Sequence, residues 1–348
     1  MKLVECVPNF SEGRDEQVIA SIAQASGDAV LHVDPNPDAH RTVMTLAGEP
    51  EAVVESAFRA ASRAAEVIDM TRHQGAHPRL GAIDVCPLVP LAGVTLDECA
   101  HLARNLGRRI GEELGIPVYF YGAAAMAPER RRLAWVRRGG YEGLSLRLED
   151  PKFKPDFGPK EFNPRSGATV VGARNILIAF NVNLDSDDLT AAEQIARSIR
   201  TAGSPARLPE CQALGWLMPG YGRAQVSLNL TDYRVTPLHV AYETVKREAG
   251  RRDRAVTGGE LVGMVPVEAL LAAGRHYLPP DRTAAEVGLE ELLATAIDGL
   301  GLASVRPFVP QEQVLELRLA QTEGAAAAWA RETIDRLSNA GGRDDMNL

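Results

Sequence analysis

The hydrophobic pattern of the chain alternates between strand-like and helix-like segments. Short apolar runs predict strands at residues 3–8, 29–34, 42–47, 81–90, 117–121, 226–230 and 261–266. Apolar positions three and four residues apart predict helices at 51–70, 95–114 and 190–202. Both halves mix strands with crossover helices, so the sequence predicts an α/β (α+β) fold. We expect two similar subdomains, each a mixed β-sheet with helices on one face.

The segment 69–87, DMTRHQGAHPRLGAIDVCP, connects a predicted helix to a predicted strand. Loops of this kind, held on a rigid scaffold, often carry site residues. His73 and His77 have the spacing of a metal-binding pair on a helix, but Pro78 disfavours a helix there and Gln74 replaces the glutamate of zinc proteases. His77 lies next to a proline and two residues from Arg79, which favours a functional histidine beside an anionic ligand. The alternative is an ordinary, partly buried histidine.

The segment 150–167 combines four prolines with three phenylalanines and several cations. So many prolines disfavour regular structure. One interpretation is a linker between subdomains, and the other is a lid whose cations and aromatic rings hold a flat polyanionic ligand. The basic stretch 130–138 is predicted to be a solvated helix face.

Composition narrows the class of protein. The 348 residues carry a net charge of −8, which argues against general binding to nucleic acid or to an anionic membrane. No stretch reaches about 18 apolar residues and no apolar signal core follows Met1, so we expect no membrane span. The four cysteines are scattered, as in a reduced cytoplasmic protein. The glycine-rich signatures of NAD and ATP sites and the G-x-S-x-G elbow of serine hydrolases are absent from the sequence.

Four motifs occur in one collinear order: ECVPNFSEGRD at 5–15, the segment 69–87, DFGP at 156–159 and GATVVGAR at 167–174. Together they resemble the formiminotransferase family (glutamate formimidoyltransferase) over about residues 1–320. The resemblance implies two α/β subdomains with a ligand cleft between them, and a cytoplasmic homodimer. The expected boundaries are 1–176 for the N-terminal subdomain with the catalytic histidine and 177–322 for the C-terminal subdomain. Residues 323–348 are expected to form an Ala-rich helix and a frayed tail, with no cyclodeaminase half.

The resemblance also implies a reaction. A formimino group passes from N-formimino-L-glutamate to N5 of tetrahydrofolate, which acts as a co-substrate, and no metal is required. One nitrogen loses a proton and another gains one, and a histidine that titrates near neutrality serves both steps. We assign His77 as this base and then acid, and Asp34, at a predicted strand end, as the carboxylate that orients it or relays its proton.

The family's folate-binding segment corresponds here to Gly158, Pro159, Lys160, Glu161, Phe162, Asn163, Pro164, Arg165, Ser166 and Gly167. Expected substrate-binding residues are Asn9, Ser11, Arg41, Arg72 and Arg79. Two positions depart from the family pattern: His40 stands where asparagine is expected, and Ser166 where tryptophan is expected. Three alternatives stay open, namely formyl transfer from N-formylglutamate, a non-catalytic folate-binding protein of the same fold, and a metal-dependent hydrolase.

Overall fold

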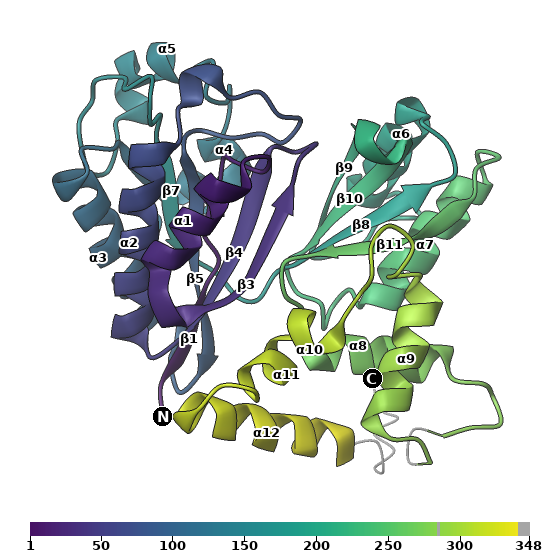
Figure 1. Ribbon diagram of the computed structural model, residues 1–348. Helices are drawn as coiled ribbons and strands as arrows, with labels where there is room; N and C mark the ends of the chain where they lie inside the picture. Colours follow the sequence, from purple (N-terminus) through teal and green to yellow (C-terminus); the bar gives the residue numbers. More distant parts are fainter. Residues whose placement is uncertain (284–285, 340–348) are drawn as a thin grey trace. The chain divides into compact units, whose positions relative to one another are not determined.

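The computed structural model describes residues 1–283 and 286–339, and the predicted frayed tail at 341–345 lies outside them. The chain divides into two compact units, Met1–Ile176 (unit 1) and Leu177–Leu348 (unit 2). Figure 1 shows the elements of both units along the chain. None of the helices in the described part of the chain combines the length and the hydrophobicity that a bilayer crossing requires.

Unit 1 is built around a seven-stranded sheet. Its strands are β1 (Leu3–Cys6), β2 (Asn9–Phe10), β3 (Val30–Asn36), β4 (Arg41–Gly48), β5 (Ile83–Ala92), β6 (Val118–Gly122) and β7 (Thr169–Ala173). Its α-helices are α1 (Glu16–Ser26), α2 (Pro50–Val67), α3 (Leu96–Glu113), α4 (Leu133–Val136) and α5 (Leu144–Glu149). Short 3-10 helices are η1 (Gly27–Ala29), η2 (Met70–Arg72), η3 (Pro128–Arg131) and η4 (Pro151–Phe153).

Unit 2 is built around a four-stranded sheet. Its strands are β8 (Ile178–Leu184), β9 (Cys211–Met218), β10 (Arg223–Leu230) and β11 (Val256–Val262), with η5 (Pro219–Tyr221) between β9 and β10. Its helices are α6 (Leu189–Arg200), α7 (Leu238–Gly250), α8 (Val267–Tyr277), α9 (Leu289–Leu300), α10 (Pro310–Gln313), α11 (Leu315–Leu319) and α12 (Gly324–Asn339).

The two sheets share one topology. In unit 1 the order β3-β4-β1-β5 is antiparallel throughout, and in unit 2 the order β9-β10-β8-β11 is antiparallel throughout. Along the chain each set reads β-α-β-β-α-β, with α1 and α2 in the first and α6 and α7 in the second. This is the ferredoxin-like split βαβ arrangement. The expectation of two subdomains of similar construction is therefore confirmed at the level of topology.

The two sheets differ at one edge. In unit 1, β5 pairs in parallel with β7, and β7 in parallel with β6, so this sheet is mixed. Among its described residues unit 2 has antiparallel strand pairs only, so the mixed sheet expected there was wrong. Parallel pairing needs a long crossover connection. In unit 1, α3 and the segment 123–168 supply it, whereas the described chain after β11 continues as helices.

The unit 1 sheet is covered on both faces, where helices on one face only were expected. The long helices α1, α2 and α3 pack against one face, on a core that includes Met44, Cys86 and Phe120 (Figure 1). Val136 of α4 and Leu144 of α5 belong to a second apolar cluster on the opposite face. The additional layer comes from short helices that the hydrophobic period did not reveal.

Helix starts follow local sequence signals. The capping box predicted at the start of α3 is present, since the Thr95 hydroxyl accepts from the Glu98 N–H and the Glu98 carboxylate accepts from the Thr95 N–H. Asp15 caps α1 by accepting from two backbone N–H groups. Residues 9–13, predicted as a loop, begin with the short strand β2, which pairs with both β4 and β5.

Candidate active site

The loop between α2 and β5 carries the histidines singled out in the sequence. It contains η2, and from residue 73 to residue 82 it is neither helix nor extended strand. His73 is buried and donates through Nε2 to the His40 carbonyl (2.8 Å), while its Nδ1 accepts from Arg79 Nε (3.1 Å). These contacts fix one neutral tautomer, and burial lowers the pKa of His73. His73 is therefore a structural histidine that holds the loop.

His40 supports the loop from the β3–β4 turn. Its ring stacks on His73, with centroids 4.2 Å apart, and its nitrogens face the Gln74 carbonyl (2.9 Å) and the Glu12 carboxylate (3.1 Å). The backbone of His40 has φ 49°, in the left-handed region. Asparagine adopts that conformation more readily than most residues do, which explains why asparagine suits this position.

His77 is half-buried at the end of the loop. Its Nδ1 lies 2.7 Å from the Pro78 carbonyl oxygen. Because a carbonyl only accepts, Nδ1 carries the hydrogen, and the lone pair of the neutral ring is on Nε2. Burial and then the charges of Arg41 and Arg137 hold the pKa of His77 well below its usual value, against the opposing effect of Asp84. The ring is therefore neutral near pH 7 and able to accept a proton.

Asp84 is the centre of a buried charge cluster beside His77. Its carboxylate is fully buried and accepts from Arg41 (2.5 Å), from Arg137 and from the Leu80 N–H (2.9 Å). Burial by itself raises the pKa of Asp84, but Arg137 and Arg41 outweigh it and bring the pKa to about 2. Asp84 is thus ionised at any ordinary pH, and the cluster is fixed by charge-assisted hydrogen bonds.

Asp34 lies on the same sheet, across β4 from this cluster. It is buried on β3 opposite Val43, and Val43 is also opposite Asn9 of β2. Directly paired residues share a face, and so do Arg41 and Val43, two residues apart on one strand. Asn9 accepts from Arg41 Nε (3.0 Å), and Arg41 in turn donates to Asp84.

The segment 151–167 is irregular apart from η4, as predicted from its prolines. Residues 158–165 are mostly exposed, and Asn163 closes a turn by accepting from the N–H groups of Arg165 (2.9 Å) and Gly167 (2.8 Å). The Phe162 ring lies 5.6 Å from that of Tyr141. An exposed segment with ordered backbone and one aromatic anchor is suited to binding a ligand at the surface of unit 1.

Backbone hydrogen bonds join this segment to the His77 loop. The Ala82 N–H donates to Ser166 (2.9 Å), the Ala168 N–H to Leu80 (3.1 Å) and the Met70 N–H to Arg165 (3.0 Å). The two segments approach so closely that a Cβ on Gly81 would lie 2.3 Å from the Ser166 carbonyl oxygen. Two segments far apart in the sequence, both predicted to carry site residues, are therefore adjacent in the fold.

The remaining predicted residues have different environments. Ser11 is buried and donates to the Gly81 carbonyl (2.7 Å), so it fixes the same junction. Arg79 forms a two-pronged pair with Glu142 (2.7 and 3.0 Å). Arg72 and Lys160 are exposed. Arg165 is exposed as well, and it donates to the Glu66 carbonyl (2.8 Å).

The basic stretch 130–138 was wrongly predicted as a solvated helix face. Arg130 is buried and pairs with Asp156 (2.8 Å), and Arg137 reaches Asp84. The stretch consists of the short helices η3 and α4, and this lets two of its arginines point inward while Arg131 and Arg138 are exposed. Arg137 gave no sequence signal. Asp84 gave a weak one, as a lone acid within an apolar strand.

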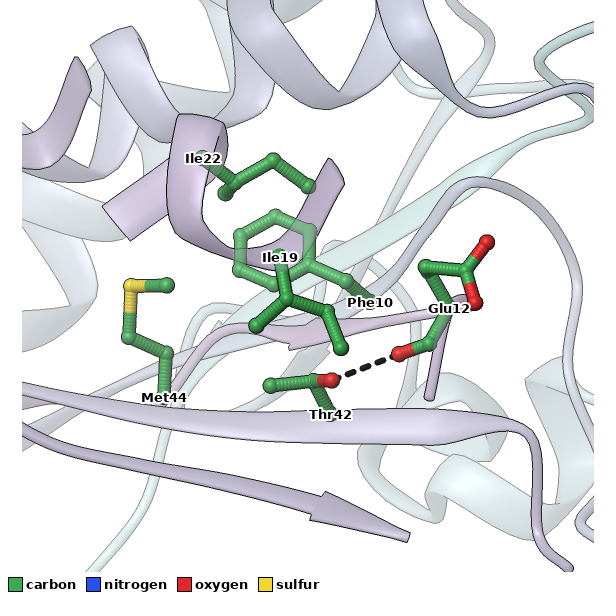
Figure 2. A pocket seen from close by; sticks show the side chains of 6 residues that line it. All are labelled: Phe10, Glu12, Ile19, Ile22, Thr42 and Met44. Atoms are coloured by element: carbon green, nitrogen blue, oxygen red, sulfur yellow. Dashed lines mark hydrogen bonds between the residues drawn. The ribbon is translucent and has the colours of Figure 1, made fainter. Parts of the chain in front are cut away.

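A pocket between α1 and β4 is unrelated to these residues (Figure 2). Its lining consists of Phe10, Glu12, Ile19, Ile22, Thr42 and Met44. The Thr42 hydroxyl donates to the Glu12 carbonyl (2.6 Å) at its polar end. It leaves no room for a water molecule, so it is not a small-molecule site.

Unit 2 has a buried polar cluster of its own. Glu260 of β11 accepts from Gln225 (3.1 Å), Asn181 (3.4 Å) and Tyr221 (3.2 Å). Gln225 in turn accepts from the Trp216 indole (2.8 Å). The hydrogen-bond donors are amides, a phenol and an indole, and Arg306 Nε lies 3.8 Å from the Glu260 carboxylate; the cluster contains no histidine.

Comparison with known proteins gives matches along most of the chain. The family model described as "Formiminotransferase domain, N-terminal subdomain" matches residues 3–174, and that described as "Formiminotransferase domain" matches residues 179–320. The glutamate formimidoyltransferases of Streptococcus pyogenes serotype M1 and Thermoplasma acidophilum are 41% and 44% identical over 281 and 284 residues, which is 80% of this chain and 93% of each relative. The formimidoyltransferase-cyclodeaminase of Rattus norvegicus is 46% identical over 323 residues, 90% of this chain. The chain covers 59% of the length of that relative.

Proposed function

Because the chain belongs to the formiminotransferase family, we propose that it transfers the formimino group of N-formimino-L-glutamate to N5 of tetrahydrofolate. The products are 5-formiminotetrahydrofolate and L-glutamate. The observation that carries the proposal is similarity at 41–44% identity to glutamate formimidoyltransferases over nearly their whole length. The neutral imidazole of His77, set beside a buried charge cluster, supports it chemically.

His77 acts first as a base and then as an acid. N5 of tetrahydrofolate attacks the amidine carbon, and as the new C–N bond forms, Nε2 of His77 takes the proton that N5 loses. The tetrahedral adduct collapses when the same proton passes to the departing glutamate nitrogen, so the ring ends as it began. General acid–base help of this kind contributes about 10²- to 10⁴-fold to rate, and holding both substrates together contributes much of the rest.

Asp34 orients His77 or relays its proton in this proposal. The support is its burial near the end of β3, on the sheet face that carries Arg41. A carboxylate held in such a place fixes the ring orientation of a catalytic histidine. Asp84 has a separate role, since its lone pairs are occupied by Arg41, Arg137 and a backbone N–H.

Folate binds along the segment 158–167 in this proposal. Its residues 158–165 are mostly exposed and include Lys160, Phe162 and Arg165, and backbone hydrogen bonds join the segment to the loop of His77. Cations meet the folate carboxylates and the aromatic ring packs on the pterin or the benzoyl group. Loss of the tryptophan at Ser166 leaves Phe162 as the aromatic contact within the segment.

The substrate carboxylates are met by the arginines near His77. Arg72 is exposed and contacts the substrate directly. Arg79 lies in the same loop as His77, and its guanidinium is held by Glu142. The site is shaped by three side chains that form hydrogen bonds to other groups of the protein and do not contact the substrate, namely Asn9, Ser11 and Arg41.

The organisation of the whole protein follows the family. Residues 1–176 form the N-terminal subdomain and 177–322 the C-terminal subdomain, and the Ala-rich helix expected after them is α12 (Gly324–Asn339). The protein acts as a homodimer. The four cysteines are free thiols, which supports the reducing cytoplasm as its location.

The test is His77→Ala, with the exposed His101→Ala as a matched control. We expect His77→Ala to lower kcat for formimino transfer about 10²- to 10⁴-fold and to leave the affinity for folic acid within a few-fold. His101→Ala should match the wild type in both. Near-normal turnover by His77→Ala would exclude the role assigned to His77. Folate binding without turnover in the wild type, or turnover with N-formylglutamate alone, would replace the proposed reaction by one of the alternatives.

A further inference from the structure

The turn between α4 and α5 is bound to the loop that carries His77. The Tyr141 N–H donates to the Arg79 carbonyl (2.8 Å). The Glu142 carboxylate accepts from both terminal nitrogens of Arg79 (3.0 and 2.7 Å), and Arg79 Nε donates to His73 Nδ1 (3.1 Å). Residues 141 and 142 are therefore fixed to the segment 73–79 by the backbone and by a side chain.

The Tyr141 side chain extends from this turn to the segment 158–167. Its hydroxyl donates to the Pro164 carbonyl. Its ring centroid lies 5.6 Å from that of Phe162, and the guanidinium carbon of Arg79 lies 5.9 Å from the same Tyr141 ring. Both distances are in the range of aromatic pairs and of cation–π contacts. Tyr141 thus bridges the His77 loop and the proposed folate segment.

The folate segment is held most firmly at its C-terminal end. The Arg165 carbonyl accepts from the Met70 N–H (3.0 Å), and the Arg165 guanidinium donates to the Glu66 carbonyl (2.8 Å). Among the described residues, no backbone–backbone hydrogen bond ties residues 159–162 to another part of unit 1. Phe162 is therefore placed by side-chain packing, against the second apolar cluster of unit 1 and against Tyr141.

The hydrogen bond from Tyr141 to Pro164 adds little to the stability of the fold. Pro164 is exposed, so water could satisfy its carbonyl nearly as well as the tyrosine hydroxyl does. What the bond fixes is the distance between two segments, one proposed to bind folate and one proposed to carry the catalytic histidine. Such a bond is suited to positioning a ligand.

We propose that Tyr141 is a positioning residue for folate: it holds Phe162 and the backbone of Pro164 at a fixed distance from the loop that carries His77. This inference rests on the proposed folate site at 158–167. Tyr141 lies outside that segment, and it supplies an aromatic support to a segment in which Ser166 replaces the expected tryptophan. An aromatic ring that is already held in place binds a flat ligand at a lower cost in entropy.

The direct test is the affinity of the full chain for folic acid, measured by isothermal titration calorimetry. Tyr141→Phe keeps the ring and removes the hydroxyl, and we expect it to raise Kd about three- to tenfold. Tyr141→Leu removes the ring contact as well and should raise Kd about ten- to a hundredfold. Tyr119→Phe is the matched control, because it removes a tyrosine hydroxyl that donates to another carbonyl of unit 1, that of Phe153 (2.7 Å). It should bind folic acid as the wild type does.

Steady-state kinetics separate positioning of folate from an effect on the chemical step. In Tyr141→Leu the KM for tetrahydrofolate should rise with Kd, whereas kcat and the KM for N-formimino-L-glutamate should stay within about twofold of the wild type. In the double variant Phe162→Leu, Tyr141→Leu the loss of affinity should be smaller than the product of the two single losses, because both changes remove the same ring contact. A lower kcat with an unchanged KM for tetrahydrofolate would overturn the inference.

Folding of each variant is checked by far-UV circular dichroism. Wild-type affinity for folic acid in a folded Tyr141→Leu overturns the inference, and if this variant does not fold, wild-type affinity in Tyr141→Phe does so. Binding is measured without turnover. A wild type that binds folic acid but transfers no formimino group therefore removes the proposed reaction, and weakened binding by the Tyr141 variants still supports the inference. A wild type that does not bind folic acid overturns both.

Discussion

The Asp84→Asn substitution is the sharpest test of the buried cluster. The change keeps the size of the side chain and removes its charge, so Arg41 and Arg137 remain buried near each other without a counterion. Removing one partner of a buried ion pair costs about 3–5 kcal/mol. With two guanidiniums stranded, we expect the upper half of that range for the unfolding of unit 1.

The pH dependence gives an independent magnitude. The pKa of Asp84 falls from 3.8 to about 2 on folding, which corresponds to about 2 kcal/mol of stability. Because the folded pKa is the lower one, this contribution is complete above about pH 4 and is lost as the pH falls toward 2. The wild type should lose it over that window, and Asp84→Asn should lack this part of the acid transition.

Urea unfolding at pH 7, followed by far-UV circular dichroism, measures the first effect. Asp28→Asn is the matched control, because Asp28 is exposed and surface changes stay within about 0.5 kcal/mol. In the double variant Asp84→Asn, Arg137→Gln one stranded charge is gone, so its cost should be smaller than the sum of the single costs. A cost below about 1 kcal/mol for Asp84→Asn, or simple additivity, would refute the reasoning.

Three further predictions concern other parts of the molecule. Glu316 is buried and accepts from the Val267 N–H (2.8 Å), and burial raises its pKa from 4.5 to about 7. Since the folded pKa is the higher one, its contribution of up to about 3 kcal/mol to stability is complete below pH 4.5 and is lost as the pH rises to 7. Glu316→Gln should therefore make the free energy of unfolding of unit 2 nearly constant across that window. Gly81→Ala should weaken folate binding at least tenfold and lower the melting temperature, because its Cβ would meet the backbone of residues 166 and 168, whereas Gly250→Ala, with open space around it, should do neither. The sulfur atoms of Cys6 and Cys86 lie 3.5 Å apart in the core, and burial raises the pKa of the Cys6 thiol. Both thiols should resist alkylation in the native protein at pH 8 and react promptly in urea. Fast labelling of the native protein would contradict their buried placement.

Local sequence signals determined much of this protein. The helix at 95–114, its capping box, and the irregular proline-rich segment at 150–167 were all predictable, because caps, periodicity and proline act within a few residues. The motifs around His77 and at 156–174 were sufficient to indicate the family. The choice of His77 over a His73–His77 metal pair also followed from local chemistry, since Pro78 disfavours the helix that such a pair needs.

Only the tertiary structure decided the rest. The Asp84–Arg137 contact spans 53 residues, and the basic stretch that contains Arg137 looks the same in sequence whether it faces water or the core. The two units share a strand order, and a shared strand order does not require a repeat in the amino-acid sequence. The antiparallel sheet of unit 2 depends on the path of the chain after β11. Pattern and capping are properties of neighbouring residues. Charge pairing and strand pairing depend on distances that exist only after the chain has folded.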